Sequence, residues 1–88
     1  MRLERRIFIE LRSHWSYVCV LAERFELKGW KVIFRPEMNA IDVVKYSYDG
    51  SELADDIDVI VNSINTTRGR VRAVYDVKTN DNMVRWVE

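Results

Sequence analysis

The spacing of apolar and polar residues divides the chain into five predicted strands and two predicted helices. The strand segments are rich in β-branched and aromatic residues or alternate between apolar and polar positions. They cover residues 6–12, 30–35, 41–48, 70–79 and 83–87. The helix segments carry apolar residues at intervals of three and four. The first begins at Ser13 or Ser16, either of which can cap it, and ends near Lys28; the second begins at Asp49 and ends before residues 67–69.

Each predicted helix has one apolar face to bury. In the first helix this face consists of Trp15, Val18, Cys19, Ala22 and Phe25. In the second helix it consists of Leu53, Ile57, Ile60, Val61 and Ile64. Gly29 stands where a left-handed residue commonly ends a helix, and Asp49 with Glu52 has the spacing of a capping box. Both helices are therefore expected to pack one side against a sheet.

The fourth predicted strand, residues 70–79, alternates between apolar and polar residues. Its buried face is expected to consist of Val71, Ala73, Tyr75 and Val77. Its opposite face is expected to consist of Arg70, Arg72, Val74, Asp76 and Lys78. On the first strand, Ile7 and Ile9 are expected to face the helices, which directs Phe8 to the other side of the sheet.

The order of these elements predicts one α+β domain over residues 1–88. Strand, helix, strand, strand, helix, strand is the ferredoxin-like, or split βαβ, plan, with both helices on one face of an antiparallel sheet. Residues 83–87 add a C-terminal strand in a hairpin after the turn at 80–82. The other sheet face is open or is covered by a partner. Because many unrelated proteins share this plan, the fold does not define the function.

The open sheet face is the first candidate binding surface. Its basic and aromatic members are Arg6, Phe8, Arg12, Lys31, Arg35, Arg70, Arg72 and Lys78. Basic side chains neutralise phosphates and an aromatic ring stacks on bases, so this face suits RNA or single-stranded DNA. The same face also suits a protein partner. It can equally be a solvated surface without a partner, if its charges pair across strands.

Residues 7–11 (Ile-Phe-Ile-Glu-Leu) resemble the first-strand signature of RNA-recognition motifs, with Phe8 at the base-stacking position. The third-strand signature of that family places two further aromatic residues on the open face. If Tyr48 matches the family's final inward aromatic, Val43 and Lys45 stand at those two positions, and the family's glycine pattern is missing. The resemblance covers the order of elements and one motif residue, and it implies RNA binding through the open face.

An acidic cluster lies at the start of the second predicted helix. Its members are Asp49, Glu52, Asp55 and Asp56. The helix dipole favours carboxylates at this end, so the cluster can be a solvated helix start. It can also dock a basic protein partner. Because no His or Cys joins these solvent-facing residues, no metal site is predicted.

A turn rich in arginine precedes the fourth strand. Arg68 and Arg70 flank Gly69, and Arg72 follows. Guanidinium groups bind phosphate or carboxylate through paired hydrogen bonds, so this turn can hold an anion. Arginines are also common in turns that only face solvent. Both interpretations remain open.

Few residues could carry acid–base or covalent chemistry. His14 and Cys19 are the only histidine and cysteine, and five helical residues place them about 140° apart around the axis. Cys19 belongs to the apolar face and is expected to be buried, and His14 is expected at the start of the helix. With three glycines in the chain, no phosphate-binding loop is predicted. We expect no catalytic residue, cofactor or metal; a small hydrolase or nuclease is a remaining alternative.

Charge is balanced in total and uneven along the chain. There are 14 basic and 14 acidic residues, with a formal net charge of zero. Residues 1–35 carry eight basic and four acidic residues, whereas residues 36–66 carry one basic and seven acidic residues. A neutral total gives no general affinity for nucleic acids or membranes, but the uneven distribution makes local patches.

Partner and compartment follow from the remaining composition. A single cysteine allows no intramolecular disulfide, and no signal or membrane-spanning segment is recognised, so we expect a cytoplasmic location. Aromatic residues of the kind that anchor interfaces are Trp15, Trp30, Trp86, Tyr46 and Tyr48. The sequence therefore predicts a non-enzymatic protein-binding module: an adaptor, a regulator or an inhibitor of a larger complex. A homodimer through the sheet face or the last strand is a further possibility. Nucleic acid is the alternative partner. No interaction with a membrane is expected.

Overall fold

The computed structural model describes residues 3–47, 50–64 and 70–77. The elements in chain order are β1 (Leu3–Leu11), α1 (Trp15–Leu27), β2 (Lys31–Arg35), the short 3-10 helix η1 (Pro36–Met38), β3 (Ala40–Ser47), α2 (Gly50–Ile64) and β4 (Val71–Asp76). The predicted α+β class and the predicted order of strands and helices are confirmed over this part of the chain. The predicted turn at 80–82 and strand at 83–87 lie outside the described residues.

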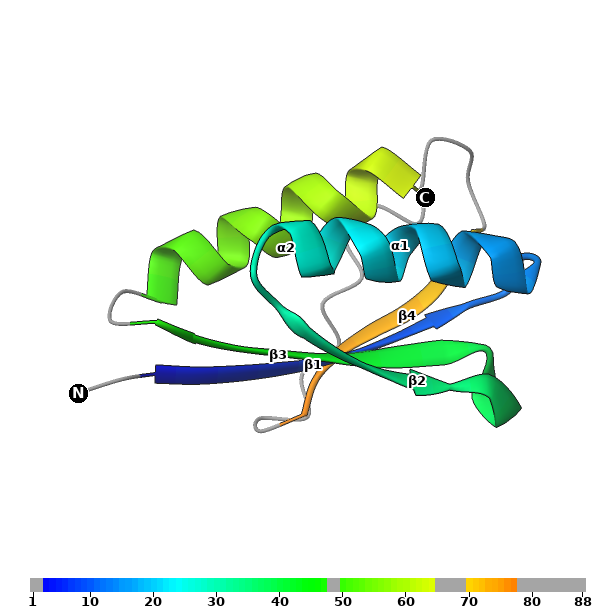
Figure 1. Ribbon diagram of the computed structural model, residues 1–88, viewed down its shortest axis with the longest axis horizontal. Coiled ribbons are helices and arrows are strands. Elements are labelled where there is room, and N and C mark those ends of the chain that lie inside the picture. Colours follow the sequence, from blue (N-terminus) through cyan, green and yellow to red (C-terminus); the bar gives the residue numbers. More distant parts are fainter. Residues whose placement is uncertain (1–2, 48–49, 65–69, 78–88) are drawn as a thin grey trace.

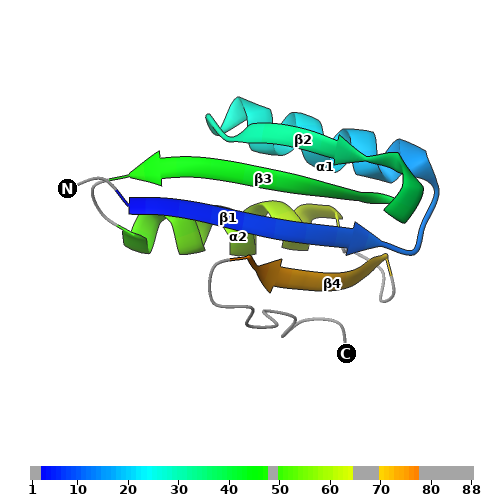
Figure 2. The ribbon, with the colours of Figure 1, turned by 90° about the horizontal axis from the view of Figure 1, so that it is seen from below.

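The four described strands form one antiparallel sheet in the order β2-β3-β1-β4. This arrangement is compatible with the ferredoxin-like plan. Both helices lie on the same side of the sheet, as Figure 1 shows from the side. Figure 2 shows the opposite side, where the strands lie in front of the helices and no described helix covers them. We call this uncovered side the open face.

The core lies between the two helices and the sheet. Its largest fully buried side chains are Phe25, Ile7, Ile9, Leu21, Ile41, Leu53, Ile57, Val18, Val43, Val61, Val71 and Val74. The ring of Phe25 meets the buried ring of Trp30 edge-on, with 5.4 Å between centroids. Edge-on contacts of this kind are a favoured aromatic geometry. Trp30 therefore belongs to the core. Its prediction as one of the aromatic residues that anchor an interface was wrong.

The apolar stripe of α2 is confirmed for the residues whose side chains are described. These residues are Leu53, Ile57, Ile60 and Val61, all buried. In α1 the prediction is partly wrong, because Cys19 is exposed and Leu21 is fully buried. On a helix wheel Cys19 and Leu21 flank Val18, about 100° to one side and about 60° to the other. The helix turns its Leu21 flank inward because leucine has more apolar surface to bury than cysteine.

The N-cap of α1 is His14 and not the predicted Ser13 or Ser16. The ring nitrogen Nδ1 of His14 accepts a hydrogen bond from the backbone amide of Ser16 at 3.1 Å. This satisfies one of the amides that have no partner within the first turn of a helix. The Ser13 hydroxyl donates instead to the carbonyl of Arg70 at 3.4 Å, so it serves a contact between loops. Gly29 follows α1 with φ of 89°, which confirms the expected left-handed position.

The β2–β3 connection is held against the end of β1 by Asn39. This residue has φ of 55°, a conformation that asparagine tolerates better than most residues. Its side-chain nitrogen Nδ2 donates to the carbonyls of Leu11 at 2.9 Å and Ser13 at 2.7 Å. The hairpin and the β1–α1 loop are therefore joined at one end of the sheet.

A β-bulge in β4 changes which of its side chains face the helices. Leu11 of β1 lies opposite Val71, whereas its neighbour Glu10 lies opposite Ala73. β4 therefore has one more residue than β1 at this point, and the alternation of its side chains reverses beyond it. Val71 faces the helices as predicted, but so does the fully buried Val74, which was expected on the open face.

The reversal also places the three residues that follow Val74 on the side of the sheet opposite to the one predicted. Tyr75 lies opposite Phe8 and points to the open face, whereas Asp76 lies opposite Ile7 and points to the helices. Asp76 is buried and accepts a hydrogen bond from Nε of Arg5 at 2.7 Å. Val77, expected in the core, is 48% exposed. The predicted faces of residues 74–77 were therefore wrong, because a strictly alternating pattern contains no information about an inserted residue.

Candidate functional site

The open face is organised in rows that cross the strands. Residues directly opposite each other in neighbouring antiparallel strands point to the same side of the sheet. One row consists of Lys31 on β2, Val44 on β3 and Arg6 on β1. The next row along the strands consists of Ile33, Asp42, Phe8 and Tyr75. The predicted placement of Arg6, Phe8, Lys31 and Arg35 on this face agrees with the strand register.

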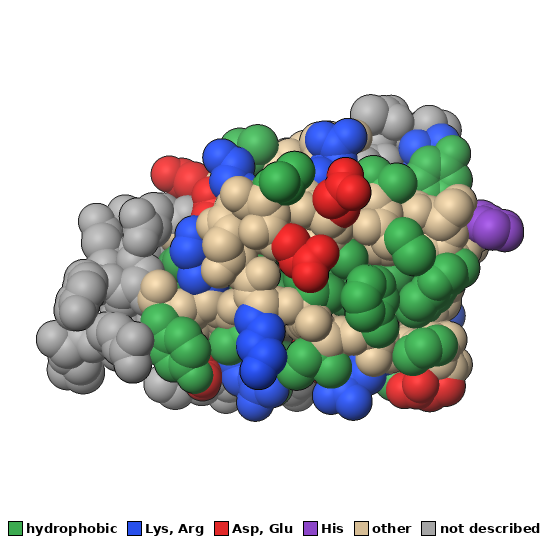
Figure 3. Space-filling model, viewed as in Figure 1, with side chains coloured by type: hydrophobic (Ala, Val, Ile, Leu, Met, Phe, Trp, Pro, Cys, Tyr) green, Lys and Arg blue, Asp and Glu red, His purple; other side chains and the backbone are tan. Residues whose placement is uncertain are grey.

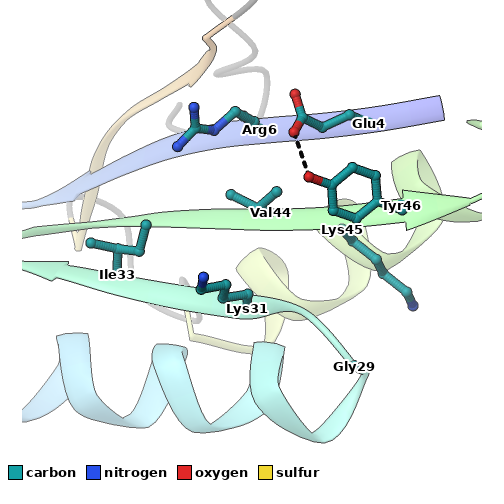
Figure 4. Close-up of a pocket in the computed structure, with 8 residues that line it drawn as sticks. All are labelled: Glu4, Arg6, Gly29, Lys31, Ile33, Val44, Lys45 and Tyr46. Atoms are coloured by element: carbon teal, nitrogen blue, oxygen red, sulfur yellow. Dashed lines mark hydrogen bonds between the residues drawn. The ribbon is translucent and has the colours of Figure 1, made fainter.

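A hollow of about 490 Å³ lies over the row of Lys31, Val44 and Arg6. Figure 4 shows the side chains of these three residues standing on neighbouring strands, with Tyr46 and Ile33 beside them. Adjacent strands are about 4.8 Å apart, so the two cationic residues are separated by about 10 Å across the backbone. Val44 is 8% exposed and forms an apolar floor between them. We call this site the cation hollow.

The carboxylates of the open face are already engaged by other side chains. The Tyr46 hydroxyl donates to Oε2 of Glu4 at 2.9 Å. Nε of Arg35 donates to Oδ2 of Asp42 at 2.6 Å. Arg72 lies 3.9 Å from the third carboxylate, that of Glu10.

Arg6 and Lys31 have no ion-pair partner among the described residues. The cation hollow is lined by Arg6, Lys31 and Lys45 and by one carboxylate, that of Glu4, so it carries an excess of positive charge. Arg35 and Arg72 lie on the same face, but each has a carboxylate beside it. The open face is consequently a mixed surface with one basic centre, on which some charges pair across strands.

Two aromatic residues lie side by side on the open face. Phe8 was predicted there, and its neighbour Tyr75 across the β1–β4 pair was not. The bulge in β4 places the Tyr75 ring outside the core. The adjacent apolar residues Ala73 and Val74 are the one sequence signal that could have indicated the break in alternation.

Several predicted members of the surface lie elsewhere. The Arg70 guanidinium covers the Tyr17 ring of α1, 3.9 Å from its centroid, and donates to the Tyr17 hydroxyl at 2.9 Å. Arg70 therefore belongs to the helix side of the sheet, and its assignment to the open face was wrong because it precedes β4, where the alternation of a strand does not apply. Arg12 is exposed beyond the end of β1. Lys78 and Arg68 lie outside the described residues.

The acidic helix start is divided between solvent and a structural contact. Asp55 is exposed, as predicted. Asp56 is half-buried, and its Oδ2 accepts hydrogen bonds from Nε1 of Trp30 at 3.1 Å and from Nζ of Lys45 at 3.2 Å. Asp56 thus connects α2 to Lys45 of the sheet and to Trp30. The expectation that it faces solvent was wrong. Asp49 and the side chain of Glu52 lie outside the described residues.

The candidate chemical groups on α1 do not form a cluster. His14 caps the helix through Nδ1, and Cys19 is an exposed free thiol. Within the described residues, no group of three His, Cys, Asp or Glu side chains could hold a metal ion. Neither helix, in the part of the chain that the structure describes, is long and apolar enough to cross a membrane.

The fold and the surface define a small α+β domain that presents an open sheet face with a cation hollow. Comparison with known proteins finds no matching family model, and neither a curated protein nor a solved structure that matches the chain. The arguments for function therefore come from the chain itself.

Proposed function

We propose that this protein is a non-enzymatic binding module that engages a protein partner through its open face. Its biological role would be that of an adaptor, a regulator or an inhibitor of a larger complex. The observation that carries the proposal is the cation hollow. There, Arg6 and Lys31 stand on either side of an apolar floor with no carboxylate partner among the described residues.

The surroundings of the cation hollow favour an acidic side chain of a protein as its occupant. A guanidinium and an ammonium group can bind one carboxylate together, because both carry N–H donors and positive charge. Ile33 and the 52% exposed Tyr46 ring beside them offer apolar contact. Tyrosine and arginine are also the residue types that contribute most to the energy of protein interfaces. Charge and apolar surface are thus combined in the way that protein interfaces combine them.

Charge reversal at the cation hollow tests the proposal. The chain carrying Arg6→Glu and Lys31→Glu is compared with the wild-type chain and with the chain carrying Arg24→Glu, a charge reversal at an exposed position on α1 that serves as the control. All three are used to capture proteins from nuclease-treated extracts of the source cells. We expect a set of proteins that the control retains and the double variant loses.

The captured partner is then purified and its affinity measured by calorimetry. Each lost ion pair is expected to weaken binding by about twofold to fivefold, the effect of a pair worth up to ~1 kcal/mol. Retention of the same proteins with the same affinity by the double variant would show that the open face is not the interface.

Single-stranded nucleic acid is the second candidate, favoured by the neighbouring Phe8 and Tyr75 rings close to the unpaired cations. Base stacking on aromatic side chains and phosphate neutralisation are the two usual contributions to such binding. The test is a salt titration with a random-sequence oligonucleotide. Loss of both Arg6 and Lys31 is expected to reduce the slope of log affinity against log salt by about 1.4, at about 0.7 per phosphate contact. No binding at low salt would remove this candidate.

The proposal extends to the fold and the compartment. Residues 83–87 would form a fifth strand in a ferredoxin-like sheet, which their apolar pattern and their position after β4 support. Protection of their backbone amides from hydrogen exchange is the expected result, and fast exchange would contradict it. We place the protein in the cytoplasm, where a lone exposed thiol such as Cys19 stays reduced.

A further inference from the structure

The strand β2 has an unpaired edge. Among the described strands it lies at the margin of the sheet and pairs with β3 alone, as Figure 2 shows. In an edge strand, alternate residues direct their backbone N–H and C=O groups away from the sheet. Within the described residues, no backbone group from another element bonds to residues 31–35 on that outer side. These groups are available to a further strand.

The side chains of β2 combine charge and apolar surface along this edge. Lys31, Ile33 and Arg35 point to the open face, and Val32 and Phe34 point to the helices. Phe34 is 44% exposed, and its ring lies 5.9 Å from that of Trp15 on α1. Figure 3 shows hydrophobic side chains gathered over the N-terminal part of α1 and β2 below it. An added strand would therefore meet cations at both ends of β2 and apolar side chains between them.

We propose that β2 receives an extended segment of another protein as an additional antiparallel strand, with acidic residues opposite Lys31 and Arg35 and apolar residues between. This inference rests on the proposed function, because it names how a protein partner with carboxylates would bind. Arg35 remains available to such a residue, because its guanidinium bonds Asp42 through Nε and has further N–H donors. Backbone hydrogen bonds would supply affinity, and the side-chain pattern would supply specificity.

The charges of β2 disfavour a second copy of the same chain as the occupant. Antiparallel pairing of two copies centred on Ile33 places Lys31 of each copy opposite Arg35 of the other. Like charges directly opposite each other in a sheet are destabilising. β2 itself contains no carboxylate to offset them. The same two cations that oppose self-pairing would attract an acidic strand.

A synthetic strand provides the test. An acetylated and amidated peptide with the sequence Gly-Glu-Val-Ile-Val-Glu-Gly is titrated into the full ¹⁵N-labelled chain and followed by NMR. We expect chemical-shift changes and slower amide exchange centred on β2. A peptide with Lys in place of both Glu residues, and the chain carrying Lys31→Glu, should each bind on the order of tenfold more weakly. A Glu peptide is also N-methylated at the alternate residues whose backbone N–H groups would face β2. It keeps its side chains but cannot donate these hydrogen bonds, so it should bind on the order of tenfold more weakly.

The outcomes separate this inference from the proposed function. If N-methylation has no effect on the affinity of the peptide, and Arg6→Glu lowers this affinity as much as Lys31→Glu does, the peptide lies over the cation hollow and the inference is wrong. Absence of binding by the Glu peptide, or self-association of the chain through β2 in sedimentation, would also overturn it. If the peptide binds at β2 and the chain carrying Arg6→Glu alone keeps its captured proteins, the inference stands and the proposed role of the cation hollow fails.

Discussion

Val74 and Val77 provide a direct test of the β-bulge that decides which side chains form the open face. Strict alternation along residues 70–79 places Val77 in the core and Val74 outside it. The structure has the opposite arrangement, with Val74 fully buried and Val77 48% exposed. Replacing each valine by alanine makes the same chemical change three residues apart. We therefore expect a large loss of stability from Val74→Ala and a small one from Val77→Ala.

The expected difference follows from burial. Each change removes two methyl groups, which at a fully buried position contribute about 1.6 kcal/mol at ~0.8 kcal/mol per group. A residual cavity of about 40 Å³ would add ~1 kcal/mol at ~24 cal/mol per Å³. Val74→Ala should therefore lower the free energy of unfolding by about 1.5–3 kcal/mol. For the half-exposed Val77 the transfer contribution is about halved and no cavity forms, so the loss should stay below about 0.8 kcal/mol.

Urea unfolding followed by tryptophan fluorescence measures both values. With a slope of about 1–3 kcal/mol per molar urea, Val74→Ala should lower the midpoint by about 0.5–3 M. The midpoint of thermal unfolding should decrease by about 6–24 °C, since about 4–8 °C corresponds to 1 kcal/mol in a domain of this size. Equal losses for the two variants, or a larger loss for Val77→Ala, would refute the bulge and with it the placement of Tyr75 on the open face.

Two further predictions concern Asp56 and Cys19, whose surroundings in the structure differ from those expected from the sequence. Asp56→Ala should destabilise the fold by about 1–2 kcal/mol in urea unfolding, because it removes the acceptor of Trp30 and Lys45, whereas the exposed Asp55→Ala should change it by less than ~0.5 kcal/mol. Equal effects would show that Asp56 is only part of a solvated helix start. Cys19 should react with a thiol reagent in the native state within about tenfold of its rate in urea, and Cys19→Ser should change stability by less than ~0.5 kcal/mol. Reaction only upon global unfolding would mean that Cys19 is buried after all.

Helix α2 illustrates a face that can be predicted from the sequence. Its apolar residues occupy one stripe, and the positions around them are mostly acidic or polar, so a single rotation of the helix buries the stripe. Helix α1 illustrates a face that was predicted only in part. Leu21 lies three residues after Val18 and four before Phe25, so helical periodicity favours it over Cys19, which lies about 100° from Val18 on the other side. The structure buries Leu21 and exposes Cys19 accordingly.

The cation hollow could be predicted only in part. The alternation of β1 and β2 places Arg6 and Lys31 on the open face without further information. Their relation to each other depends on the register of both strands with β3, which brings them to either side of Val44. The pairing of Asp42 with Arg35 and of Glu4 with Tyr46 depends on the same register. Sequence alone therefore identifies the charged residues but not which of them have partners.

The sequence by itself determined the order of the elements, the buried face of α2 and the open-face residues of β1 and β2. These features depend on local periodicity and on residues such as Gly29 and Pro36 that end an element, and such signals are contained in a few neighbouring positions. The tertiary structure alone decided the bulge in β4 and which cations of the open face have an ion-pair partner among the described residues. Those features arise where segments far apart in the chain meet, because strand register and packing are determined by the partner and not by the segment itself.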